Sequence, residues 1–147
     1  MTHLRYLALV WLFVAAPFAA AGDKGKATDN TWAKIISGLL TPEQSKKGLQ
    51  LQENAAVKPD TILSYAAKDL GAKLSLKMIQ EKYGKPSKTE EYKVKDGNKI
   101  LTRKEYHYPP IYFVADKDSD EVFLISAPKR LWSGPGILEN AKAALKK

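Results

Sequence analysis

The hydrophobic pattern of this chain changes from helical to alternating spacing near Pro86, and that change decides its fold class. Before Pro86, apolar residues recur at helical spacing, as Trp32, Ile35 and Ile36 do on one face. After Pro86, apolar and polar residues alternate, and a turn signal at residues 96–98 interrupts the alternation. Helices that precede a set of hairpin-linked strands indicate an α+β domain with an antiparallel sheet.

The N-terminal helices are predicted by local start signals. A first helix is expected from Thr31, which can cap it. A second helix follows Thr41, with Pro42 at its first position and Gln44 completing a capping box.

Two further helices are expected before the strands begin. Residues 59–71 carry an apolar stripe at helical spacing and end at Gly71, a natural stop residue. Residues 75–84 begin at the capping residue Ser75 and end at Gly84.

The second half of the chain predicts an antiparallel meander of about four strands. Strands are expected at residues 91–95, 100–108, 111–115 and 122–125. The third of these is a continuous apolar run, which is typical of a central strand. Residues 137–145 are expected to form a C-terminal helix that closes the domain.

Residues 1–21 have the three parts of a secretory signal peptide. Arg5 provides a positive charge, an apolar run follows, and the small residues Ala19 and Ala21 precede a charged segment. We expect cleavage after Ala21 and therefore a periplasmic or secreted protein. The apolar stretch is shorter than the roughly 20 residues that span a bilayer, which disfavours the alternative of an uncleaved membrane anchor.

The remainder of the chain divides into a flexible leader and one domain. Residues 22–30 are rich in Gly, Lys, Asp and Asn, and residues 31–147 have the length of a single α+β domain. The chain has no Cys, so disulfide bonds do not stabilise it. No second apolar segment has membrane length, so we expect no transmembrane segment after the predicted cleavage.

The charge balance of the chain is basic. It has 24 Lys and Arg against 16 Asp and Glu, a formal net charge of +8, and nearly all the basic residues are Lys. This balance fits either a solubilising surface or an anionic partner such as lipid headgroups or an envelope polymer. Arg is the side chain that recognises phosphate through two hydrogen bonds, and no nucleic-acid-binding motif is present, so nucleic acid is not an expected partner.

The residue types present argue against catalysis. The chain has no thiol nucleophile, and His107 is the single His after the predicted cleavage site. No Gly-x-Ser-x-Gly elbow is present, and one His is an uncommon basis for a zinc site. The acidic run at residues 116–121 lacks the Gly that a calcium loop needs at its sixth position. We therefore expect no enzyme activity, no cofactor and no metal site.

Aromatic and Arg side chains in the second half of the chain are the candidate binding residues. A Tyr has an apolar ring and a polar hydroxyl, which suits an interface, and the Trp lies in a Gly/Pro-rich loop after a basic pair. Packing within the domain itself is the alternative for the aromatic residues. The candidates are Arg103, Tyr106, Tyr108, Tyr112, Arg130 and Trp132.

Four short segments of residues 75–126 form a recognisable pattern. They are a helix opened by Ser75, a stop at residues 84–86, an aromatic strand end at 106–108 and a hairpin at 111–125. This pattern resembles the SmpA/OmlA family of small outer-membrane-assembly lipoproteins and, more broadly, the fold of the β-lactamase inhibitor protein. That family carries a lipidated Cys after its signal sequence, which this chain lacks. The resemblance implies two helices on an antiparallel sheet, used for protein or lipid contact.

These observations predict an exported, non-enzymatic binding or adaptor domain that acts in the cell envelope through a sheet face and a basic surface. Its expected partner is an envelope protein or an anionic envelope polymer or lipid. Two alternatives stay open. One is a secreted protein inhibitor of a hydrolase, which the fold resemblance implies, and the other is a small enzyme that uses His107 with carboxylates.

Overall fold

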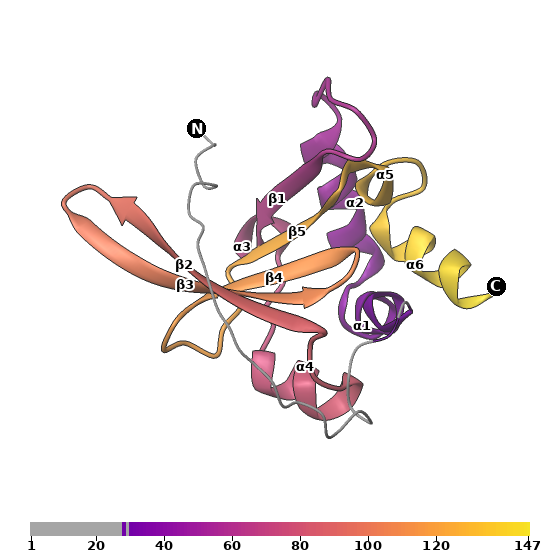
Figure 1. The fold of residues 1–147 in the computed structure, drawn as a ribbon. Coiled ribbons are helices and arrows are strands. Elements are labelled where there is room, and N and C mark those ends of the chain that lie inside the picture. The colour runs from indigo at the N-terminus through magenta and orange to yellow at the C-terminus, as the bar shows by residue number, and fades with distance from the viewer. Residues whose placement is uncertain (1–27, 29) are drawn as a thin grey trace.

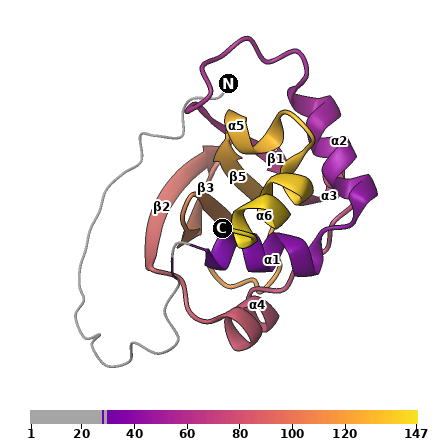
Figure 2. The ribbon, with the colours of Figure 1, turned by 90° about the vertical axis from the view of Figure 1, so that its right-hand side faces the viewer.

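The computed structural model describes residue 28 and residues 30–147. The predicted signal peptide, residues 1–21, and most of the predicted leader, residues 22–30, lie outside the described residues. The described part has the predicted α+β architecture, in which helices pack against an antiparallel sheet (Figures 1 and 2).

The sheet has five antiparallel strands in the order β1-β5-β4-β3-β2. The central position of β4 agrees with its continuous apolar run, because a central strand is paired on both edges. Strands β2 to β5 form the predicted meander. The strands are β1 (Ile62–Ala66), β2 (Lys88–Asp96), β3 (Lys99–Tyr108), β4 (Ile111–Asp116) and β5 (Leu124–Pro128).

The longer helices α1, α2 and α6 pack together on one face of the sheet, and Figure 2 shows α1, α5 and α6 in front of the strands. The capping box of α2 forms as predicted, since Thr41 accepts from the backbone of Gln44 and the Gln44 side chain accepts from the backbone of Thr41. The helices are α1 (Thr31–Leu39), α2 (Pro42–Gln52), α3 (Ala67–Leu70), α4 (Leu76–Tyr83), α5 (Lys129–Trp132) and α6 (Ile137–Leu145).

The helix predicted over residues 59–71 is wrong for most of its length. Residues Ile62–Ala66 form β1, which pairs with β5, and helix begins again at Ala67. The hydroxyls of Ser64 and Ser126 are 2.7 Å apart across this pair. A partner strand some sixty residues away decides the conformation of this short segment, and no local signal reports that partner. The predicted stop is correct, because Gly71 has a left-handed φ of 77°.

Two element boundaries also differ from the prediction. The residue that precedes α1 is Asn30, so Thr31 lies in the first turn and not at the cap. The last strand was expected at residues 122–125 but runs from Leu124 to Pro128, because the backbone N–H of Val122 bonds instead to the carbonyl of Leu74.

The core lies between the helices and one sheet face, which we call the helix face. Phe113 and Ile125 point into it from neighbouring strands, and Trp132 fills it from α5. The opposite side of the sheet, which we call the outer face, is not covered by these helices (Figure 2). Within the described residues, no helix has the length and apolar character to cross a membrane.

Candidate functional site

Two of the candidate binding residues are packed inside the domain. Tyr108 is fully buried on the helix face, and its hydroxyl donates to the carbonyl of Gly84 at 2.9 Å. Trp132 is also fully buried, and its indole N–H donates to the carbonyls of Leu63 and Ala127. Neither side chain offers a surface to a partner, so both stabilise the fold.

Three of the other candidates lie in two separate parts of the domain. Arg103 and Tyr112 are on the outer face, where Arg103 lies 4.4 Å from the centroid of the Phe123 ring. Arg130 lies near the opposite edge of the sheet, and its Nε is 3.3 Å from a carboxylate oxygen of Asp60. The structure therefore separates the predicted site residues instead of gathering them.

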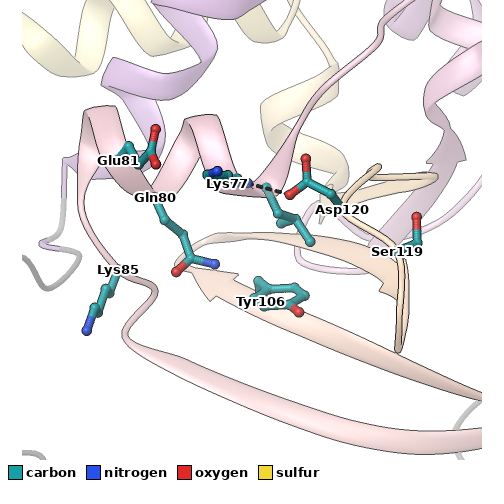
Figure 3. A pocket seen from close by; sticks show the side chains of 8 residues that line it. Lys77, Gln80, Glu81, Lys85, Tyr106, Ser119 and Asp120 are labelled. Carbon is teal, nitrogen blue, oxygen red and sulfur yellow. Dashed lines mark hydrogen bonds between the residues drawn. The ribbon is translucent and has the colours of Figure 1, made fainter.

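Tyr106 is the candidate that reaches an accessible surface on the helix side of the sheet. It lines an open groove of about 540 Å³ between α4 and the sheet (Figure 3). In Figure 3, Gln80 points from α4 toward the Tyr106 ring. The groove is lined by Leu76, Lys77, Gln80, Glu81, Lys85, Tyr106, Ser119 and Asp120.

The acidic member of this groove is occupied by a structural contact. Asp120 accepts a hydrogen bond from the backbone N–H of Lys77 at 2.7 Å, and the Ser75 hydroxyl donates to its other oxygen. Ser75 itself caps α4 by accepting from the backbone of Met78, as predicted. The negative charge of Asp120 is thus placed at the positive end of a helix.

Tyr106 keeps its proton in this setting. Burial raises the pKa of the Tyr106 phenol, and the nearby charges of Asp120 and Glu91 raise it further. The hydroxyl is therefore a neutral group that can donate a hydrogen bond, which suits contact with an anionic oxygen.

Strands β2 and β3 extend beyond the rest of the sheet as a two-stranded hairpin, whose residues 93–102 we call the arm (Figure 1). Strand β4 pairs with β3 only over residues 103–108, so the arm has no third strand beside it. Gly97, with a φ of 66°, forms the predicted turn at its end. Most side chains of the arm are consequently exposed, while Val94, Leu101 and Thr102 are half-buried.

One face of the arm is basic and carries an apolar residue at its end. The register pairs Lys93 with Thr102 and Lys95 with Ile100, which places these side chains on the same face as Tyr106. Ile100 is 68% exposed. Within the part of the chain that the structure describes, neither Lys93 nor Lys95 forms an ion pair. On the same face, closer to Tyr106, the Nζ atom of Lys104 lies 3.8 Å from a carboxylate oxygen of Glu91.

The arm and the groove together form one candidate site, which we call the basic surface. It runs from the end of the arm along β3 to the groove under α4, and a groove with these side chains is suited to binding and not to covalent chemistry. Its basic, apolar and aromatic members are Lys77, Lys85, Lys93, Lys95, Ile100, Lys104 and Tyr106, and the acidic side chains Glu81, Glu91 and Asp120 lie along it as well.

Sequence reasoning found only Tyr106 of this surface. The alternation of β3 in the sequence places Ile100 and Lys104 on the Tyr106 face, and the hairpin register adds Lys93 and Lys95 to that face. Lys77 of α4 and Lys85, which follows that helix, line the groove only because the tertiary fold sets α4 beside β3.

Residues of metal-ligand type occur elsewhere, on the outer face. His107 lies with Glu90 and Glu105, and their ligand atoms are within 4.8 Å of one another. Among the described residues, this is the arrangement that could hold a cation.

No protein-family model, curated protein or solved structure matches this chain. The resemblance of residues 75–126 to the SmpA/OmlA family accordingly stays a prediction.

Proposed function

We propose that this chain is a non-enzymatic binding domain of the cell envelope that docks on an anionic lipid surface through the basic surface. One observation carries the proposal. Ile100 is the most exposed of the large hydrophobic side chains in the described residues, and it lies at the free end of the arm beside Lys95.

An exposed Ile among lysines favours lipid over a soluble polyanion. Lysine side chains next to an anionic leaflet contribute about 1 kcal/mol each. Burial of an Ile side chain in acyl chains contributes about 1.5–3 kcal/mol. If three of the five lysines of the basic surface reach the leaflet together with Ile100, the binding free energy is roughly 5 kcal/mol. That value corresponds to a dissociation constant of about 10⁻⁴ M and thus to reversible attachment. A soluble polyanion uses the lysines but gains nothing from the Ile.

The lysine contribution is tested by co-sedimentation of residues 22–147 with vesicles. We expect binding to phosphatidylglycerol vesicles, loss of binding at high salt, and little binding to phosphatidylcholine vesicles. The double variant Lys93→Gln, Lys95→Gln should bind anionic vesicles roughly 10- to 30-fold more weakly. The matched control is Lys46→Gln, Lys47→Gln, which removes the same charge from exposed positions of α2 and should have a much smaller effect.

The apolar contribution is tested by Ile100→Ser, which should weaken vesicle binding about 10-fold. Leu51→Ser is the control, because Leu51 is a partly exposed residue of α2, away from the arm. Equal binding by the arm variants and the α2 variants would reject the basic surface. Binding that depends on the lysines but not on Ile100 would reject lipid in favour of a soluble polyanion.

A further inference from the structure

A cluster of three metal-ligand side chains lies on the outer face, on the part of the β2–β3 hairpin that is further from the turn than the arm. Glu90 in β2 and Glu105 in β3 are direct cross-strand partners, and His107 follows two residues after Glu105 on the same face. The Nε2 atom of His107 is 3.0 Å from Oε1 of Glu105 and 3.7 Å from Oε1 of Glu90. The two-residue turn of the hairpin sets this register, so the strands themselves bring the three groups together.

The ligand atoms of the three residues lie within 4.8 Å of one another, close enough to converge on one cation once the hydrogen bond between His107 and Glu105 is given up. Zinc binds His nitrogen and carboxylate oxygen at about 2.0–2.2 Å, which places neighbouring ligand atoms of a tetrahedron roughly 3.4 Å apart. The two distances from His107 lie on either side of that separation. We propose that Glu90, Glu105 and His107 form a binding site for a zinc-class divalent cation.

Neighbouring residues hold the ligands in place. The Lys88 ammonium bonds to Oε2 of Glu90 at 2.7 Å, which leaves Oε1 of that carboxylate directed toward His107. The Tyr112 ring packs edge-on against the His107 imidazole, with centroids 4.7 Å apart. Of these two contacts, the hydrogen bond to the Glu90 carboxylate is of the kind that orients metal ligands in known sites.

The exposure of the ligands places the cation at the surface. The side chain of His107 is 15% exposed, that of Glu105 is 27% and that of Glu90 is 45%. Three protein ligands would bind the ion from the sheet side, and water would complete its coordination from the solvent side.

The site also relieves an unfavourable pairing. Like charges directly opposite each other in a sheet are destabilising, and Glu90 faces Glu105 in the register. A divalent cation between the carboxylates converts that repulsion into two bonds. The imidazole ligand favours zinc over calcium or magnesium, which prefer oxygen ligands alone.

The test is calorimetric titration of the purified full chain with zinc chloride. We expect one zinc ion per chain and a melting temperature that rises by roughly 10 °C at a zinc concentration 100-fold above the dissociation constant. Calcium should give no comparable shift. Glu90→Gln and His107→Gln should each weaken zinc binding at least about 10-fold. Cobalt bound in place of zinc should show a tetrahedral absorption spectrum that both variants lose.

Glu91→Gln is the matched control, because Glu91 is adjacent to Glu90 but points to the other face and pairs with Lys104. It should bind zinc as the wild type does. Circular dichroism in the presence of a chelator checks that each variant folds. Should His107→Gln fail that check, the half-exposed Glu90→Gln carries the test. Absence of binding up to about 1 mM zinc, or unchanged affinity in Glu90→Gln, would overturn the proposal.

Discussion

Tyr108 shows at the scale of one residue how burial couples stability to pH. Its ring is fully buried, and its hydroxyl is bonded to the carbonyl of Gly84. Burial, with a smaller contribution from Tyr106, raises the pKa of the Tyr108 phenol well above its ordinary value. Burial raises the pKa of Tyr65 and Tyr106 as well. The native state therefore keeps protons that the unfolded chain releases at high pH.

We expect the free energy of unfolding to fall as the pH rises above about 10, where tyrosines of the unfolded chain ionise. Below that pH the phenols are protonated in both states, so they add no pH dependence. The measurement is urea denaturation across the alkaline range, with tyrosinate absorbance as a second signal. Tyr108→Phe lowers stability at neutral pH through the lost hydrogen bond, but its alkaline decline should be shallower. A decline as steep as that of the wild type would contradict this account.

At the scale of one element, α4 depends on a carboxylate from a distant loop. Asp120 accepts from the backbone of Lys77 and from the Ser75 hydroxyl, so it supplements the local cap of the helix. Sequence inspection identified Ser75 as the cap, because that signal lies within three residues of its acceptor. It did not identify Asp120, which lies more than forty residues away along the chain.

Asp120→Ala should lower the free energy of unfolding by about 1–2 kcal/mol, because it leaves a helix N-terminal N–H without its acceptor. Chemical denaturation measures the change. Asp118→Ala is the control, since Asp118 lies in the same exposed loop and makes no hydrogen bond or ion pair within the described residues. It should change stability by less than about 0.5 kcal/mol. Equal effects of the two substitutions would show that Asp120 does not support the helix.

Prediction of elements succeeded where the signal was local and failed where it was not. The boundaries of α4 and α6 agree with the sequence pattern. By contrast, β1 reads as part of a helix, because residues 62–66 also fit a helical stripe. Its pairing with β5 overrides that local preference.

At the scale of the whole molecule, the arm projects beyond the rest of the sheet (Figure 1). Residues 95–100 make their backbone pairing within the hairpin, and the core lies elsewhere. The fold should therefore tolerate a shorter arm, whereas the proposed lipid binding should be lost.

Replacement of residues 95–100 by Asn-Gly shortens the arm while Val94 and Leu101 still flank a two-residue turn. The deletion spans two cross-strand pairs, so the alternation of hydrogen-bonded pairs is kept. We expect a melting temperature within about 5 °C of the wild type and loss of binding to anionic vesicles. Thermal unfolding and co-sedimentation measure the two properties. Unfolding of the shortened protein would show that the arm is part of the cooperative domain, and intact vesicle binding would exclude the arm as the lipid contact.

For the candidate sites, as for the fold, features that depend on local register can be predicted from the sequence and features that depend on tertiary packing cannot. Counting outward from the turn would have paired Glu90 with Glu105, so the cross-strand pair of the proposed zinc-class site could have been predicted from the sequence. How deeply a side chain is buried could not be predicted from the sequence in the same way. Tyr106 and Tyr108 share one face of β3, yet only Tyr106 reaches the groove, because the position of α4 decides what is covered.

The sequence by itself determined the α+β class, the capping box of α2, the span of α4, the hairpin turn and the C-terminal helix, because each depends on residues close together in the chain. Only the tertiary structure decided that residues 62–66 form a strand, that Tyr108 and Trp132 are core, and that Lys77 and Lys85 line a groove with Tyr106. These features depend on contacts between distant segments, whose free energy exists only once the chain has folded.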